Sequence, residues 1–341
     1  MSTLIPSLLS ILLAALTSYI LSIVVERNAL RLGLVKAPNE RSSHVIPTAR
    51  GGGAGLALVG VVGCGLLALN DAPLLAVVSG LGAIIAVMGF IDDLRDVSVT
   101  IRLGVQAASV IVFVVSAALL IGDTGDAVTA YGIAILCLTS VAGIWWINAF
   151  NFMDGIDGIA ASQAGLVLVG AALLWLYADS NAFETPVFGA MMTIAAGTGG
   201  LLLRNWPPAK IFMGDVGSTF LGFVLFAVVL ITVTTDAIPM ASWIILLSVF
   251  VTDSTITIMR RTCRGERPWH AHRRHAYQQL SRRWGHQTVT LLYASLTALW
   301  AFPLAVASLA NPSSAVWLVL ASYIPLSGLA VWAGAGARDE R

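Results

Sequence analysis

Charged residues are what this sequence of 341 residues lacks most. Only 11% of its residues are Asp, Glu, Lys or Arg, whereas 57% are hydrophobic, and the mean hydropathy is +0.86. A soluble domain carries about 25% charged residues, so this chain has too few to cover a surface in water. The shortage excludes a soluble enzyme, a disordered protein and a nucleic-acid-binding protein, and we expect no nucleic acid among its partners.

Metal-binding and disulfide patterns of cysteine are also absent. Cys64, Cys137 and Cys263 stand far apart, with no Cys-x-x-Cys pair, so we predict neither a structural disulfide nor a zinc site. The Gly-rich stretch at residues 51–53 lacks a following Gly-Lys-Ser/Thr, and it is therefore not a P-loop.

Long apolar runs are what the sequence does contain. A helix of about 20 apolar residues spans a bilayer, and eleven runs approach that length. They lie near residues 4–25, 52–70, 74–91, 103–121, 128–147, 159–178, 186–203, 217–235, 239–259, 287–307 and 313–333. We predict an all-α, polytopic integral membrane protein with about 11 transmembrane helices, forming a single integral membrane domain over residues 1–341.

The placement of basic residues predicts the orientation. All 19 Lys and Arg residues follow an odd-numbered run, and the connections after even-numbered runs carry none. Basic loops stay in the cytoplasm, so we expect the N-terminus outside and the C-terminus inside. The cytoplasmic loops then lie near residues 26–51, 92–102, 148–158, 204–216 and 260–286. These loops hold nearly every chemically active side chain, which places the active site on the cytoplasmic face.

Acidic residues stand where predicted spans end. Asp92 and Asp93 follow the third run, and adjacent carboxylates are costly there unless they are paired, hydrated or metal-bound. A solvated helix end with an Asp–Arg pair is the open alternative. Asp215 opens the eighth run, where it is either an N-cap or a hard oxygen ligand for Mg²⁺.

The densest polar motif follows the fifth run, where four amide and carboxylate side chains recur at intervals of three residues. They are Asn148, Asn151, Asp154 and Asp157. In a helix this spacing forms one polar stripe, and Gly155 and Gly158 permit a tight turn or the close approach of a phosphate. An Asx-rich turn that caps the next span is the simpler alternative.

The longest cytoplasmic loop is basic. It contains His270, His272, Arg273 and His275, a set that fits either contact with anionic lipid or a clamp for phosphate oxygens. Within the ninth run, Asp253 is a second-tier candidate, because an intramembrane carboxylate is functional by default. Pairing with a nearby basic residue is its alternative. Together the motifs predict metal-assisted phosphoryl transfer from an anionic cytoplasmic donor to a lipid.

At these motifs the chain resembles the polyprenyl-phosphate N-acetylhexosamine-1-phosphate transferases (glycosyltransferase family 4). This family includes phospho-MurNAc-pentapeptide translocase and the GlcNAc-1-phosphate transferases of O-antigen initiation. Five motifs between about residues 30 and 290 carry the resemblance. They are Pro-Thr…Gly-Gly at 47–53, Asp-Asp-x-x-Asp at 92–96, Asn-x-x-Asn-x-x-Asp-Gly-x-Asp-Gly at 148–158, Phe-Met-Gly-Asp-x-Gly-Ser at 212–218 and His-x-His at 270–272.

The resemblance implies transfer of a sugar-1-phosphate from a UDP-N-acetylhexosamine to undecaprenyl phosphate, with release of UMP and with Mg²⁺ or Mn²⁺. It implies that Asp92 and Asp93 ready the lipid phosphate, preferably by deprotonation, and that Asp154 and Asp157 are catalytic. Asp215 would hold the metal. The other implied roles are metal binding by Asn151 and Asp154 and substrate binding by Thr48, Asn148, Asn151, Phe212, His270, His272 and Arg273.

One departure and one rival remain. Arg273 stands where the family often has a further histidine, and its permanent charge suits phosphate binding better than proton transfer. Residues 204–210 look closer to the O-antigen-initiating branch, which favours a role in lipopolysaccharide biosynthesis at a bacterial cytoplasmic (inner) membrane. A nucleotide-sugar transporter is the alternative function, and a homodimer is an open alternative for the assembly.

Overall fold

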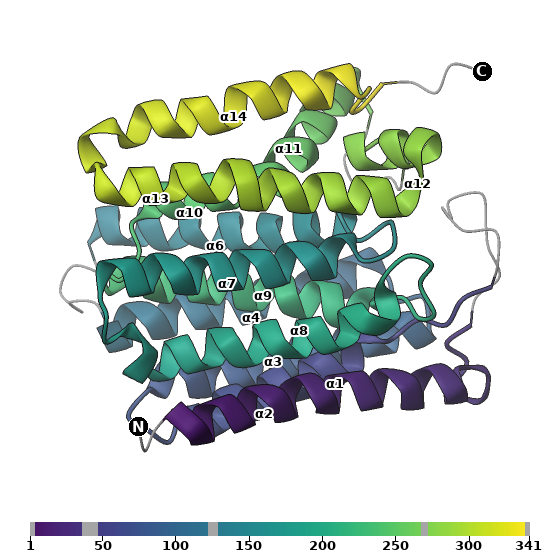
Figure 1. Ribbon diagram of the computed structural model, residues 1–341, viewed down its shortest axis with the longest axis horizontal. Coiled ribbons are helices and arrows are strands. Elements are labelled where there is room, and N and C mark those ends of the chain that lie inside the picture. The colour runs from purple at the N-terminus through teal and green to yellow at the C-terminus, as the bar shows by residue number, and fades with distance from the viewer. Residues whose placement is uncertain (1–3, 36–46, 122–128, 267–271, 338–341) are drawn as a thin grey trace.

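The computed structural model describes residues 4–35, 47–121, 129–266 and 272–337, and it shows an all-α protein (Figure 1). No β-strand occurs in these four ranges; Ala49 alone forms isolated bridges, to Val35 and to Ile211. His270 lies outside the described residues. The first half of the bundle consists of α1 (Leu4–Leu32), α2 (Gly53–Leu67), α3 (Pro73–Leu94), α4 (Val99–Ile121), α6 (Ala130–Phe152), α7 (Ile159–Ala178) and α8 (Pro186–Asn205).

The second half begins with the central helix of the bundle. It consists of α9 (Gly214–Thr234), α10 (Met240–Leu246), α11 (Ser248–Thr262), α12 (Ala276–Ser295), α13 (Phe302–Ala310) and α14 (Ala315–Trp332). A π-helical turn, η2 (Leu296–Ala301), joins α12 to α13, and single 3₁₀ turns at Ala182–Glu184 (η1) and Pro312–Ser314 (η3) precede α8 and α14.

The predicted multi-pass membrane fold is confirmed, with two differences in the spans. Across the described ranges, nine helices are long and apolar enough to cross a membrane, and α10 with α11 forms a tenth candidate bent by 70°. The bend falls inside the predicted run at 239–259. The run at 52–70 gives only the 15 residues of α2, which is apolar but shorter than a full span.

The two ends of the bundle differ in their chemistry. The described chain begins at one end of the bundle and finishes at the other (Figure 1). The connections after α1, α3, α6, α8 and α11 all lie at the end where the chain finishes. These are the connections that the sequence predicts to be cytoplasmic. Their location at one end of the bundle is observed, whereas the side of the membrane that this end faces stays a prediction.

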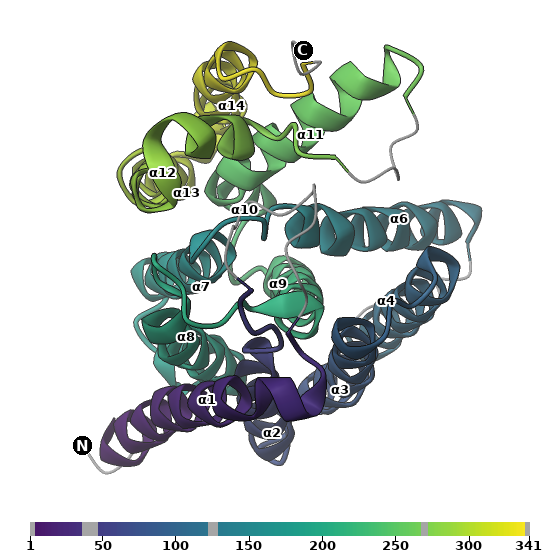
Figure 2. The same cartoon turned by 90° about the vertical axis from the view of Figure 1, so that its right-hand side faces the viewer.

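The central helix α9 is buried over most of its length (Figure 2). Two glycines let its start approach its neighbours. A Cβ atom added to Gly89 of α3 would lie 2.5 Å from the carbonyl oxygen of Asp215, and one added to Gly53 of α2 would lie 2.3 Å from the Cα of Gly217. Any side chain there would push α9 away, so glycine at both positions fixes where Asp215 stands.

Candidate active site

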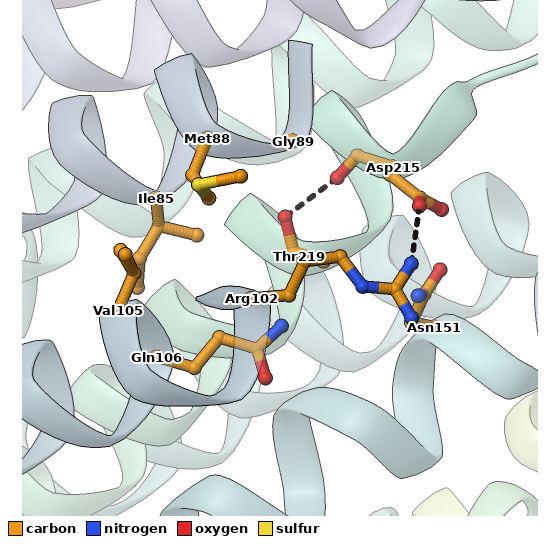
Figure 3. A pocket seen from close by; sticks show the side chains of 9 residues that line it. All are labelled: Ile85, Met88, Gly89, Arg102, Val105, Gln106, Asn151, Asp215 and Thr219. Carbon is orange, nitrogen blue, oxygen red and sulfur yellow. Dashed lines mark hydrogen bonds and ion pairs between the residues drawn. The ribbon is translucent and has the colours of Figure 1, made fainter. Parts of the chain in front are cut away.

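Four helix ends meet at one small pocket (Figure 3). The end of α3 and the start of α4 contribute Gly89 and Arg102, the end of α6 contributes Asn151, and the start of α9 contributes Asp215. The wall is completed by Ile85, Met88, Val105, Gln106 and Thr219. Polar groups from segments more than 100 residues apart in the chain therefore face one space at the end of the bundle.

Arg102 connects Asp215 of this pocket to the neighbouring carboxylate of Asp92. Its Nη1 lies 2.6 Å from Oδ2 of Asp92 and 3.2 Å from Oδ2 of Asp215. Asp92 is buried, whereas about a third of the Asp215 and Arg102 side chains is exposed. A cation therefore stands between two acidic side chains that would otherwise repel each other. In the sequence Arg102 is one of the basic residues that predict the orientation, and its place at the site was not predicted.

Asp93 holds the start of α9 in place. Its two carboxylate oxygens accept hydrogen bonds from the backbone N–H groups of Asp215, at 3.0 Å, and Val216, at 3.1 Å. These donors have no partner within their own helix, so Asp93 acts as a cap supplied by another helix. Gly214 has a φ of 75°, and a Cβ there would lie 2.4 Å from Asp93. Asp93 is thus engaged by the backbone beside Asp215, which favours positioning over proton removal.

Only the first half of the predicted polar stripe lies in a helix: Asn148 and Asn151 belong to α6, whereas Asp154 and Asp157 lie in the turn after it. Asn151 Oδ1 accepts a hydrogen bond of 2.7 Å from the Ser218 hydroxyl of α9. One turn earlier, Asn148 Nδ2 donates to Oε1 of Gln106 at 2.8 Å. Gln106 was missed in the sequence, although a glutamine inside an apolar run is itself a signal. Asn151 thus lines the pocket directly, while Asn148 is linked to it through Gln106.

Asp154 lies in the turn after α6, where its carboxyl interacts electrostatically with the charged groups of the site. Burial first, and then the negative charges of Asp215 and Asp93, raise the pKa of its carboxyl well above the ordinary value. The Arg50 guanidinium opposes this effect. Mutual repulsion of this kind indicates a cluster of carboxylate oxygens, and a bound cation would reduce that repulsion.

Asp157 is engaged away from the pocket. Its Oδ2 accepts a hydrogen bond of 3.0 Å from the backbone N–H of Ala209, and its Oδ1 lies 3.4 Å from Nδ1 of His286. The carboxylate therefore ties the turn after α6 to the loop after α8 and to α12. Its predicted catalytic role stays a prediction, and its contacts are those of a residue that fixes three segments.

Two predicted substrate-binding loops lie side by side. The backbone N–H of Phe212 donates to the carbonyl of Ala49 at 2.8 Å, and the N–H of Gly52 donates to the carbonyl of Phe212 at 2.9 Å. Thr48 directly precedes this junction. The motifs at 47–53 and 212–218 are therefore joined by their backbones, and the second leads directly into Asp215.

The described part of the His-x-His loop lies at the start of α12. The ring of His272 stacks on that of His275 with 4.9 Å between centroids. The backbone N–H of Arg274 donates a hydrogen bond to Nδ1 of His272 at 3.3 Å. Burial first, and then the neighbouring His275, lower the pKa of His272 to about 3. His272 is therefore neutral near pH 7 and offers a phosphate one hydrogen bond, not a positive charge. Arg273 follows directly and supplies a permanent charge.

The donor set fits a hard divalent cation. Within the described ranges, no three His, Cys, Asp or Glu side chains form a closed metal-binding group. Mg²⁺ does not require one, because it is commonly held by one or two carboxylates together with substrate phosphates and water. Asp215 with the oxygens of Asn151 and Asp154 meets this requirement, and these residues would hold the ion.

Comparison with known proteins finds a matching family model and several similar transferases. The family model described as Glycosyl transferase family 4 matches residues 75–233. A probable undecaprenyl-phosphate N-acetylglucosaminyl 1-phosphate transferase of Bacillus subtilis is 31% identical over 73% of this chain and 70% of its own length. A decaprenyl-phosphate N-acetylglucosaminephosphotransferase of Mycobacterium tuberculosis is 30% identical over 92% of this chain and 85% of its own.

A phospho-N-acetylmuramoyl-pentapeptide-transferase of Mycolicibacterium paratuberculosis is also similar, with 29% identity over 65% of this chain and 71% of its own length. The fold and these similarities indicate a multi-pass membrane enzyme that transfers phosphosugars. The chain belongs to glycosyl transferase family 4. The resemblance seen in the five motifs is thereby confirmed.

Proposed function

We propose that this protein transfers an N-acetylhexosamine-1-phosphate from a UDP-sugar to undecaprenyl phosphate and releases UMP. The convergence of Asp92, Arg102 and Asp215 at one end of the helix bundle carries this proposal. A water-soluble diphosphate and a lipid phosphate both require such a location, where charge meets the bilayer surface. The names of the similar bacterial transferases support the same reaction.

The proposed chemistry is a single displacement. An oxygen of the lipid phosphate attacks the β-phosphorus of the donor, the bond to the bridging oxygen breaks, and UMP leaves with that oxygen. A divalent ion, Mg²⁺ or Mn²⁺, neutralises charge on the phosphate oxygens when it is bound. Asp215, Asn151 and Asp154 would hold that ion, and Arg273 and His272 would bind the diphosphate.

The lipid phosphate needs little help to lose its proton, because comparable monoesters have a second pKa of about 6. Asp93 caps α9 with both carboxylate oxygens, and Asp92 accepts hydrogen bonds from Arg102 and from the N–H of Val97. We therefore assign both residues to positioning of Asp215 and Arg102. The earlier preference for deprotonation becomes the alternative.

A donor panel tests the proposal. Purified protein is incubated with undecaprenyl phosphate, Mg²⁺ and each of several UDP-N-acetylhexosamines, including 6-deoxy forms, and UMP release is measured. Release that requires both lipid phosphate and metal is expected. Flux of UDP-sugar into vesicles that contain no lipid acceptor would instead support the transporter, which none of the similar proteins named above favours.

The route is tested separately. If the reaction passed through a phosphorylated aspartate, labelled UMP would exchange into UDP-sugar without any lipid phosphate. We expect no such exchange. The proposed setting is the cytoplasmic face of a bacterial inner membrane, where the donor nucleotide would reach the pocket. The product would start a lipid-linked surface glycan of the O-antigen type.

A further inference from the structure

Asp253 lies deep in α11 and is almost completely buried. Its Oδ1 accepts hydrogen bonds from the backbone N–H of Ala276, at 2.8 Å, and from the Thr257 hydroxyl, at 3.2 Å. Its Oδ2 accepts from the N–H of Tyr277, at 3.0 Å, and from the Tyr293 hydroxyl, at 2.7 Å. Four donors occupy the roughly four lone-pair positions of one carboxylate, which leaves little capacity to bind an ion or carry a proton.

Two of these four donors belong to the first turn of α12, whose N–H groups have no partner within the helix. The carboxylate of α11 therefore fixes the start of α12 from another helix. Nδ1 of His275 lies 3.4 Å from Oδ1 of Asp253, so the residue before the helix is held at the same point.

The start of α12 connects two parts of the candidate site. Toward the His-x-His loop, His275 stacks on His272 at 4.9 Å. Toward the pocket, Tyr277 stacks on His275 at 5.6 Å and donates its hydroxyl to the carbonyl of Phe152 at 2.8 Å. Phe152 stands between Asn151 and Asp154, which are assigned to the metal. The anion-binding loop and the metal-binding turn thus meet at Tyr277.

The same loop has a second attachment that does not involve Asp253. The backbone N–H of Gly336 donates to the carbonyl of Arg274 at 2.7 Å, and the Arg274 guanidinium pairs with Glu266 at 2.8 Å. Loss of the Asp253 contacts should therefore shift the loop and loosen it without detaching it.

We infer that Asp253 is a positioning residue that sets the spacing between the His272–His275 loop and the Asn151–Asp154 turn, and thereby the fit of the donor diphosphate. The inference rests on the proposed function. It also resolves the question left open in the sequence: Asp253 pairs with helix N–H groups and hydroxyls, and it acts through the residues that those groups belong to.

Asp253→Asn tests this inference, because the amide keeps the shape of the carboxylate but turns one acceptor into a donor that faces other donors. Thr257→Val is the matched control, since it removes one hydroxyl from the same carboxylate and leaves both α12 contacts intact. Both variants are made in the full-length protein, and hydrogen exchange of the amides at 276–280 is measured beside the KM for each substrate.

Asp253→Asn is expected to speed exchange at Ala276 and Tyr277 while α9 stays protected. The KM for the UDP-sugar should rise on the order of tenfold, as is typical when the residues that orient a ligand are disturbed. The KM for the lipid phosphate should change by less than about twofold, because the substitution is not expected to disturb the binding of that substrate. Thr257→Val should change neither quantity.

If amide exchange is unchanged in Asp253→Asn, Asp253 does not fix the start of α12. If the KM for the UDP-sugar is unchanged, Asp253 has no role in donor binding. A fall in kcat alone, in proportion to the folded fraction, also overturns the inference, since a merely structural residue would produce that result. A wild-type protein that releases no UMP from any donor contradicts the proposed function instead, so the two failures are distinguishable.

Discussion

Arg102 reaches Asp215 across the space between α4 and α9, with Nη1 3.2 Å from Oδ2, and the same nitrogen lies 2.6 Å from Asp92. The guanidinium therefore supplies positive charge beside the carboxylate that is proposed to bind the metal. A divalent ion on Asp215 would also supply positive charge. Arg102 and the metal consequently share the task of neutralising these carboxylates.

Arg102→Gln is expected to destabilise the metal-free protein, because two partly buried carboxylates lose a charged donor. The loss should be about 1–3 kcal/mol, the usual contribution of hydrogen bonds to charged groups. Added Mg²⁺ should raise the melting temperature of the variant more than that of the wild type. Arg95→Gln, at an exposed position between α3 and α4, is the control and should respond to Mg²⁺ like the wild type. An equal Mg²⁺ response in Arg102→Gln would contradict the shared role.

Asp93→Asn separates positioning from base catalysis. An asparagine can still accept one of the two N–H bonds at the start of α9, but its NH₂ group then faces the other donor. We expect a lower plateau of the pH–rate profile with its shape unchanged, because Asp215 is displaced. Loss of the acidic limb of the profile would show that Asp93 removes a proton.

His272 gives the protein a defined pH dependence. Its pKa is about 3 when folded against an ordinary value of 6.5, so the unfolded chain binds more protons as the pH falls below 6.5. Stability is therefore lost on acidification through that range. Between pH 7 and pH 5, the wild type should lose about 1–2 kcal/mol more than His272→Gln, measured as a shift in melting temperature. Equal losses in the two proteins would contradict a buried, neutral His272.

Gly155 tests the junction between the turn after α6 and α12. A Cβ added there would lie 2.2 Å from the Tyr277 hydroxyl oxygen, so Gly155→Ala should destabilise the protein by about 1–3 kcal/mol through overpacking. Tyr277→Phe removes that oxygen and should relieve part of the cost in the double variant. The coupling, measured in a double-mutant cycle, is expected to be about 0.5–2 kcal/mol.

Gly199→Ala is the control for this cycle, because a Cβ on that glycine of α8 meets no atom within 4 Å. It should be close to neutral, and it should show no coupling to Tyr277→Phe. If Gly155→Ala and Tyr277→Phe were simply additive, the close contact between the turn and α12 would be disproved.

Much of the fold follows from the sequence, because a long apolar run leaves a helix as almost the only structure that satisfies its backbone in lipid. Each predicted run is helical over most of the part that the structure describes. The bend between α10 and α11 and the shortness of α2 were not predicted. Hydropathy is averaged over a window of residues, so a helix break or a helix that is a few residues short hardly changes its value.

The candidate site was only partly predictable. Asp92 was predictable because adjacent carboxylates are costly at the end of an apolar span. Asn151 and Asp215 stand in polar motifs beside such spans, and all three residues lie near the start of α9. Partners were not predictable, because the contact between Arg102 and Asp215 joins positions 113 residues apart and depends on how α4 packs. For the same reason, spacing alone could not show that Asp157 binds Ala209 or that Asp253 caps α12.

The central claim is that Asp215 holds the metal for phosphosugar transfer, and Asp215→Asn tests it most directly. The rate of UMP release is measured with undecaprenyl phosphate, Mg²⁺ and the best UDP-sugar of the panel. The control is Asp236→Asn, an exposed residue that follows α9 at its opposite end. We predict that Asp215→Asn folds normally and loses at least about 10²-fold in rate, while Asp236→Asn keeps it. A near-normal rate for Asp215→Asn in Mg²⁺ would contradict the account.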